Sequence, residues 1–130
     1  MENPKEIPRK VWHGLESKSY LEIAQELPTS DDLRKWIAIY AIYQLDFENR
    51  RPGRRFYRFI EDSKGSNYVA IEFTIPKRAL ETQDSIDSSD ITITKLKTLE
   101  TEDNINHFIR ENHISPELFT PPWGCDYPLS

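Results

Sequence analysis

The strongest constraint on the fold is the stretch from Trp36 to Ile75, where three apolar runs follow one another closely. The runs are WIAIYAIYQLDF, FYRFI and NYVAIEFTI, and the polar segments ENRRPGRR and EDSKGS separate them. Short apolar runs bounded by Gly, Pro, Asn and Ser are typical of β-strands joined by turns. We therefore predict an antiparallel meander as the scaffold of the chain.

The first run, residues 36–47, fits two secondary structures, because a helix and a strand would each gather its apolar residues on one side. The strand face would carry Ile37, Ile39, Ala41, Tyr43, Leu45 and Phe47. Its richness in Ile, Tyr and Trp favours the strand, since β-branched and aromatic side chains pack well on a pleated surface. We expect a helical turn at about 30–35 and then a long strand, with a continuous helix as the alternative.

Three further strands complete the predicted sheet. Residues 54–61 alternate as a second strand, and residues 68–75 form the third, with Pro76 at its end. The segment 64–67, KGSN, is typical of the turn between them. Residues 91–97, ITITKLK, predict a fourth strand at a sheet edge, where lysines discourage pairing with other chains.

Two helices are predicted outside the meander. In residues 19–27, Ser19 and Glu22 have the spacing of a capping box, and Pro28 would end the helix. Residues 101–112 begin with acidic groups, which favour a helix start, and continue with an apolar stripe. The fold class that follows is α+β, with a mainly antiparallel sheet of about four strands, one or two N-terminal helices and a C-terminal helix.

The length of 130 residues predicts one domain over residues 1–130. Within it, residues 1–14 are rich in proline and charge and predict an extended arm. Residues 81–90, ETQDSIDSSD, predict an acidic flexible loop. Residues 113–130 hold several prolines and aromatic residues without a period, and they predict an irregular tail pinned across an apolar surface.

Composition narrows the function classes. The net charge is −5, with 11 Lys and Arg against 9 Asp and Glu in the first 60 residues and 6 against 13 in the rest. This balance disfavours a dedicated nucleic-acid binder. No apolar run approaches the roughly 20 residues of a membrane span, and the N-terminus does not resemble a signal peptide. The single cysteine excludes an internal disulfide framework. We expect a cytoplasmic protein without membrane contact.

An arginine segment, residues 50–58, is the first candidate binding site. Its basic members are Arg50, Arg51, Arg54, Arg55 and Arg58. Guanidinium groups bind phosphates and carboxylates through paired hydrogen bonds, and the neighbouring Tyr57 offers a ring for stacking. The segment therefore indicates an anionic partner, or a hairpin that its own charges keep soluble.

Six residues have the spacing of the buried and turn positions in helix-turn-helix DNA-binding units, and the segment 19–37 resembles such a unit. The residues are Ile23, Ala24, Leu27, Ser30, Leu33 and Ile37. With the arginine segment as a wing, the resemblance implies a winged-helix DNA binder. Pro28 stands where Gly is usual, and Asp31 and Asp32 stand where base contacts would form. Nucleic-acid binding is therefore the alternative function.

Two further candidate contact regions lie in the second half of the chain. The loop contributes Asp84, Asp87 and Asp90, an acidic face suited to steering a basic protein. The tail contributes Trp123 and Tyr127, residue types that are common at the centres of protein interfaces.

No assembled set of catalytic or metal-binding residues is visible. His107 and His113 are six residues apart, which does not place them on one helix face, and no pattern links Cys125 to a histidine base. We therefore expect no enzyme activity, cofactor or metal. The function that remains is binding of a macromolecule, foremost another protein, as inhibitors, antitoxins and immunity proteins do. The sequence leaves the oligomeric state open.

Overall fold

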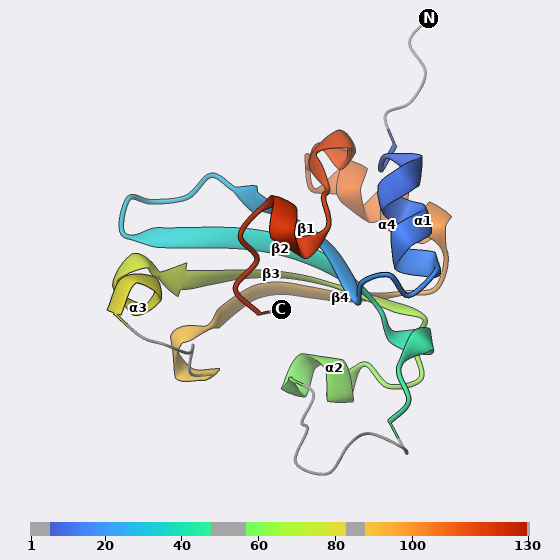
Figure 1. Cartoon of the computed structure of the whole chain (residues 1–130), viewed down its shortest axis with the longest axis horizontal. Helices are drawn as coiled ribbons and strands as arrows, with labels where there is room; N and C mark the ends of the chain where they lie inside the picture. Colours follow the sequence, from blue (N-terminus) through green and yellow to red (C-terminus); the bar gives the residue numbers. More distant parts are fainter. Residues whose placement is uncertain (1–5, 48–56, 83–87, 130) are drawn as a thin grey trace, which may run out of the picture.

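A computed structural model describes residues 6–47, 57–82 and 88–129. Four antiparallel strands form one sheet in the order β1-β2-β3-β4 (Figure 1). The strands are β1 (Glu22–Leu27), β2 (Leu33–Ala41), β3 (Tyr68–Pro76) and β4 (Thr92–Leu99). The predicted α+β class and its four-stranded meander are confirmed.

Short helices connect and cover the strands. The α-helices are α1 (Arg9–Glu16), α2 (Arg58–Asp62), α3 (Lys77–Thr82) and α4 (Glu102–Glu111). The 3-10 helices are η1 (Ile42–Gln44), η2 (Ser88–Asp90), η3 (Pro116–Leu118) and η4 (Pro122–Gly124). Figure 1 shows α1 and α4 on one side of the sheet and α2 on the other. Within the described ranges, no helix is both long and apolar enough to cross a membrane.

The sheet separates two apolar cores. The helical core lies on the side of α1 and α4 and also takes Ile114 and Phe119 from the tail. The tail core lies on the side of α2 and α3 and takes Tyr127 and Leu129 from the end of the tail. Successive residues of a strand point to opposite faces, so β2 supplies Ile37 and Ile39 to the helical core and Trp36 and Tyr40 to the tail core. Because both faces are buried, β2 from Trp36 onward is a continuous apolar run, and β3 is apolar apart from Glu72, Thr74 and its final Pro76.

The predicted helix over residues 19–27 is wrong, because residues 22–27 form β1. Each residue of β1 pairs with β2, from Glu22 opposite Tyr40 to Leu27 opposite Lys35. The predicted helical turn at 30–35 is also wrong, since Asp31 and Asp32 form the turn of this hairpin. Pairing with β2 buries four consecutive residues of β1, and this burial outweighs the local capping signal.

The first run is a strand over residues 36–41, so the helical alternative is wrong there, but it turns into η1 at Ile42. The predicted second strand is wrong over residues 58–61, which belong to α2; residues 54–56 lie outside the described ranges. Phe59 and Ile60 are adjacent and both reach the tail core. A strand would point them to opposite faces, whereas one turn of helix lets both face the sheet.

The predicted extended arm over residues 1–14 is wrong over residues 9–14, which belong to α1; residues 1–5 lie outside the described ranges. Trp12 and Leu15 of α1 are buried in the helical core, and this burial favours the helix. The predicted loop 81–90 begins in α3 and ends in η2, and its residues 83–87 lie outside the described ranges. The fourth strand and the C-terminal helix are confirmed. Thr101 caps α4 by accepting a hydrogen bond from the Asn104 backbone at 3.1 Å.

Candidate partner-binding surface

The C-terminal tail contains a tight turn, Pro121-Pro122-Trp123-Gly124, which we call the Trp123 turn. Proline fixes φ at its first two positions, and Pro122 is buried. The backbone N–H of Gly124 donates to the Pro121 carbonyl at 2.9 Å. The N–H of Tyr127 donates back to the Pro122 carbonyl at 3.1 Å. The turn therefore closes on itself, with little freedom left in its backbone.

Three contacts attach this turn to the sheet. Thr120 and Ala24 of β1 exchange backbone hydrogen bonds of 2.9 and 3.0 Å. The indole N–H of Trp36 donates to the Cys125 carbonyl at 2.9 Å. The phenols of Tyr40 and Tyr127 share a buried hydrogen bond of 2.5 Å. Because the anchors stand on both sides of Trp123, the turn has a fixed position on the rigid sheet.

The Trp123 side chain projects from this fixed turn into water. It is 72% exposed, the largest exposed fraction among the large hydrophobic side chains that the structure describes. Its one aromatic contact within the described ranges is edge-on with Tyr20, at 5.5 Å between ring centroids. Burying such a ring against a partner would remove a large apolar area from water, and this side chain is the best-placed candidate for that role.

The turn also depends on a close approach at Gly124. A Cβ atom at this position would lie 2.7 Å from both the Cβ and the Oγ1 of Thr120. Thr120 cannot move aside easily because its backbone is paired with Ala24. We expect Gly124→Ala to lower the free energy of unfolding by about 1–3 kcal/mol, as overpacking does.

Urea denaturation of the wild type and the Gly124→Ala variant measures this difference. The variant Gly65→Ala is not a suitable control, because Gly65 has a positive φ of 97°. A better control is Gly124→Ala in a Thr120→Ala background, compared with Thr120→Ala alone, because Thr120→Ala removes the crowding Oγ1 and the loss caused by Gly124→Ala should be smaller there. An unchanged free energy of unfolding for Gly124→Ala would show that the turn is looser than described.

The structure places the other predicted contact residues differently. Tyr127 is buried and supports the Trp123 turn from beneath. Tyr57 is partly exposed and stacks on Phe59, at 5.6 Å between centroids. Arg58 is exposed, 3.5 Å from Asp62, and Asp90 is half-buried in η2. The remaining predicted residues lie outside the described ranges: Arg50, Arg51, Arg54, Arg55, Asp84 and Asp87.

The helix-turn-helix resemblance has no structural counterpart, because its segment forms the hairpin of β1 and β2. The candidate catalytic groups do not form a set either. His107 pairs with Glu111 at 2.6 Å on α4, whereas Cys125 packs beside the tail core across the sheet. Burial raises the pKa of the Cys125 thiol, which disfavours the reactive thiolate. No three metal-ligating side chains come together in the described part of the chain.

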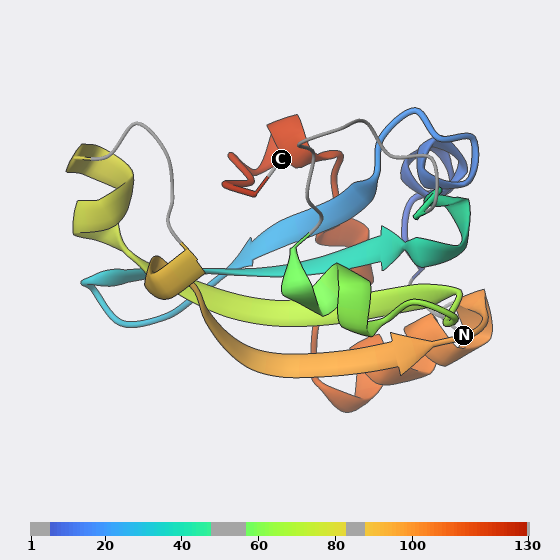
Figure 2. The same cartoon turned by 90° about the horizontal axis from the view of Figure 1, so that it is seen from below.

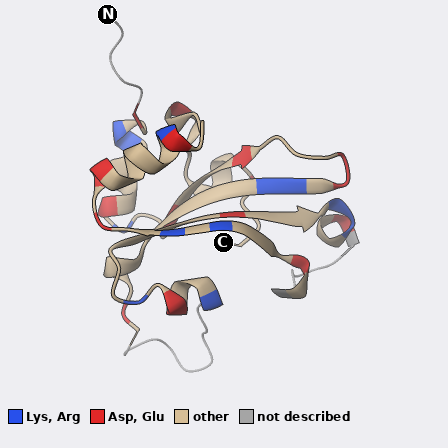
Figure 3. Cartoon of the chain, turned by 180° about the vertical axis from the view of Figure 1, so that it is seen from behind, with Lys and Arg blue, Asp and Glu red and all other residues tan. Residues whose placement is uncertain are grey.

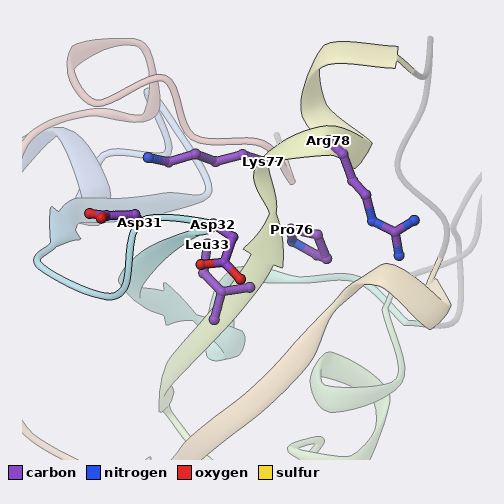
Figure 4. A pocket seen from close by; sticks show the side chains of 6 residues that line it. All are labelled: Asp31, Asp32, Leu33, Pro76, Lys77 and Arg78. Atoms are coloured by element: carbon purple, nitrogen blue, oxygen red, sulfur yellow. The ribbon is translucent and has the colours of Figure 1, made fainter.

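A shallow groove of about 530 Å³ lies where the β1–β2 turn meets the start of α3 (Figure 4). It is lined by Asp31, Asp32, Leu33, Pro76, Lys77 and Arg78. The backbone N–H of Lys77 donates to the Asp32 carbonyl at 2.9 Å, which closes this corner of the fold. The side chains of Lys77 and Arg78 point in different directions in Figure 4. Two acids and two bases that do not converge give the groove no preference for a charged ligand.

A tight turn at residues 121–124 can be predicted from the sequence, but the contacts that anchor this turn to the sheet cannot. Two prolines before an aromatic residue and a glycine indicate a tight turn. The partners that fix it, Ala24, Trp36 and Tyr40, are more than 80 positions away and reach it only through the sheet. Comparisons of the chain with protein-family models, curated proteins and solved structures found no match.

Proposed function

We propose that this chain is a small non-enzymatic protein of the cytoplasm that acts by binding another protein, in the manner of an inhibitor, antitoxin or immunity protein. The Trp123 turn is the centre of the contact surface. The observation that carries the proposal is an indole 72% exposed on a turn anchored at both ends. Trp is the residue type most often found at the energetic centre of protein interfaces.

The rigidity of the Trp123 turn should favour binding as much as the exposure of its indole does. Association costs free energy for each side chain and loop that must be ordered, and a turn that is already fixed avoids much of this cost. The Trp123 turn is fixed by its prolines, by Thr120 and by Tyr127. A partner with an apolar pocket could therefore receive the indole without the tail reorganising.

Charged groups beside the turn supply a polar rim, which interfaces have around an apolar centre. Asp126 follows the turn, has a side chain 84% exposed and lies 4.0 Å from Arg34. Arg34 also donates two hydrogen bonds to Glu26, at 2.7 and 2.8 Å, and sits over the Trp36 ring. These charges are placed to orient a partner around Trp123.

The test is an affinity capture from native cells with the tagged wild type, Trp123→Ala and Tyr43→Ala. Tyr43 is another exposed aromatic residue, outside the tail, and serves as the matched control. We expect one stoichiometric protein with the wild type, retained by Tyr43→Ala. Its affinity for Trp123→Ala should be lower by about 2 kcal/mol or more, a factor of about 30. Melting curves show whether each variant is folded.

Two outcomes would contradict the proposal. One is equal capture by the wild type and Trp123→Ala. The other is the absence of a protein partner together with salt-sensitive binding of duplex DNA or RNA that is lost in Arg54→Ala/Arg55→Ala. The second outcome would favour the nucleic-acid alternative, with the arginine segment as the site.

A further inference from the structure

The exposed indole of Trp123 has one aromatic neighbour in the described ranges, and this neighbour comes from the N-terminal part of the chain. Tyr20 lies in the connection between α1 and β1 and meets the indole edge-on, with 5.5 Å between ring centroids and 81° between ring planes. Figure 2 shows this connection and the C-terminal tail at the same edge of the sheet, across from β4. The contact therefore joins the Trp123 turn to the segment that follows α1.

The backbone before Tyr20 is held by the end of α1. The N–H of Ser19 donates to the Gly14 carbonyl at 2.9 Å, and the N–H of Lys18 donates to the Leu15 carbonyl at 3.3 Å. Lys18 itself has a positive φ of 65°. Two such bonds around a left-handed residue form the Schellman motif, which ends a helix in a defined direction. The helix end therefore sets the place where Tyr20 begins.

The Tyr20 side chain is held at two further points, both on α1. Its hydroxyl donates to the Val11 carbonyl at 2.5 Å. Its ring lies against Gly14, where an added Cβ atom would be 2.2 Å from the hydroxyl oxygen. The ion pair between Arg9 and Glu102 ties α1 in turn to α4, and Figure 3 shows the acidic and basic residues of both helices. The Tyr20 ring is therefore fixed on α1 at its backbone, its face and its hydroxyl.

We propose that Tyr20 is a positioning residue, which holds the exposed indole of Trp123 in one orientation before a partner binds. This inference rests on the proposed function of the Trp123 turn. The prolines fix the backbone of the turn but do not restrain rotation of the Trp123 side chain, and a side chain loses such freedom when a partner buries it. Edge-on aromatic contact is stabilising beyond the area that it buries. Tyr20 therefore removes part of this freedom in advance, and the cost of binding falls.

The test observes the indole directly and needs no partner. A fluorinated tryptophan analogue replaces the three tryptophans of the chain, of which Trp12 and Trp36 are buried. The fluorine NMR resonance of Trp123 is the one lost in Trp123→Phe. In Tyr20→Leu we expect this resonance to move toward that of the free analogue and to narrow, because the neighbouring ring is lost and the indole reorients faster. Tyr20→Phe keeps the ring and should keep the resonance close to its position in the wild type.

Tyr43→Leu is the matched control. Tyr43 makes the same kind of edge-on contact, with 5.5 Å between its ring centroid and that of Tyr68, and this contact does not involve the tail. The control should leave the Trp123 resonance unchanged, and melting curves show that each variant is folded. The inference is overturned if the resonance is the same in Tyr20→Leu as in the wild type, or if Tyr43→Leu changes it as much.

The partner captured by the wild type provides the second measurement. Tyr20→Leu should weaken its binding by about two- to tenfold, the cost of ordering one side chain, which is less than the effect of Trp123→Ala. Equal binding by the wild type and Tyr20→Leu would overturn the inference. A changed resonance in Tyr20→Leu without any captured partner would refute the proposed function alone. An unchanged resonance with a partner that requires Trp123 would refute the positioning role alone.

Discussion

Replacing Trp36 by Ala is expected to lower the free energy of unfolding by about 3–5 kcal/mol, the range for deleting a large buried aromatic side chain. The Trp36 side chain is fully buried and stacks on Phe73 at 5.9 Å between centroids. Its indole N–H also holds the tail through the Cys125 carbonyl. The substitution therefore leaves a cavity in the tail core and releases an anchor of the Trp123 turn. Urea or thermal denaturation measures the loss.

Two further variants separate these contributions. Trp36→Phe keeps an aromatic ring but removes the N–H that donates to the Cys125 carbonyl. Loss of this hydrogen bond should lower the free energy of unfolding by about 1–2 kcal/mol, in addition to the cost of the smaller ring. Trp123→Ala removes the same type of side chain from the surface, and we expect it to cost less than about 1 kcal/mol. If Trp36→Ala costs no more than Trp123→Ala, then Trp36 does not hold the tail core together.

The parts of the fold that the sequence predicts correctly are those in which local pattern and tertiary environment agree. In β3, Val69, Ile71 and Phe73 alternate with residues of the opposite face, and the turn before it contains Gly65 at φ 97°. In α4, Thr101 provides the cap and Ile105 and Ile109 the buried stripe. In each case the short-range signal and the buried face give the same answer.

The errors occur where tertiary burial competes with a short-range signal. Ser19 and Glu22 have the spacing of a capping box, yet Glu22 belongs to β1 and is buried opposite Tyr40. Tyr57 to Ile60 alternates only weakly, and the need to bury both Phe59 and Ile60 on one side selects a helix. No short window of the sequence contains the strand partner or the core that decides these cases.

The candidate site divides in the same way. The exposed lysines of β4 follow from a predicted edge strand, whereas the local pattern of the tail does not show that Trp123 is exposed. The tail is predicted to be pinned on an apolar surface, but that Tyr127 and not Trp123 does this could not be predicted, because the environment of Tyr127 is made by Tyr40 on β2 and Phe73 on β3. Two aromatic residues of the same short tail thus have opposite roles: Trp123 is exposed to solvent, and Tyr127 holds the tail against the sheet.

The pair of phenols in the tail core is expected to make the fold sensitive to alkali. Burial raises the pKa of Tyr40 and of Tyr127 well above the ordinary value for a phenol. In the unfolded chain both phenols ionise near pH 10, whereas in the folded protein they keep their protons. Since the folded pKa is the higher one, the contribution to stability is complete below about pH 10 and is lost as the pH rises above it.

Each phenol that ionises only in the unfolded state lowers the free energy of unfolding by about 1.4 kcal/mol for each pH unit above about pH 10 and by little below it. The pair therefore accounts for about 3 kcal/mol between pH 9 and pH 11. The comparison is with Tyr40→Phe/Tyr127→Phe, which leaves every other titratable group of the protein in place. This variant removes both partners of one hydrogen bond and should remain folded at pH 7. Between pH 9 and pH 11, urea denaturation should show that the free energy of unfolding falls by about 3 kcal/mol less in the variant than in the wild type. Equal losses in the two proteins would mean that the phenols ionise in the folded state, and that the tail is not held against Tyr40 as described.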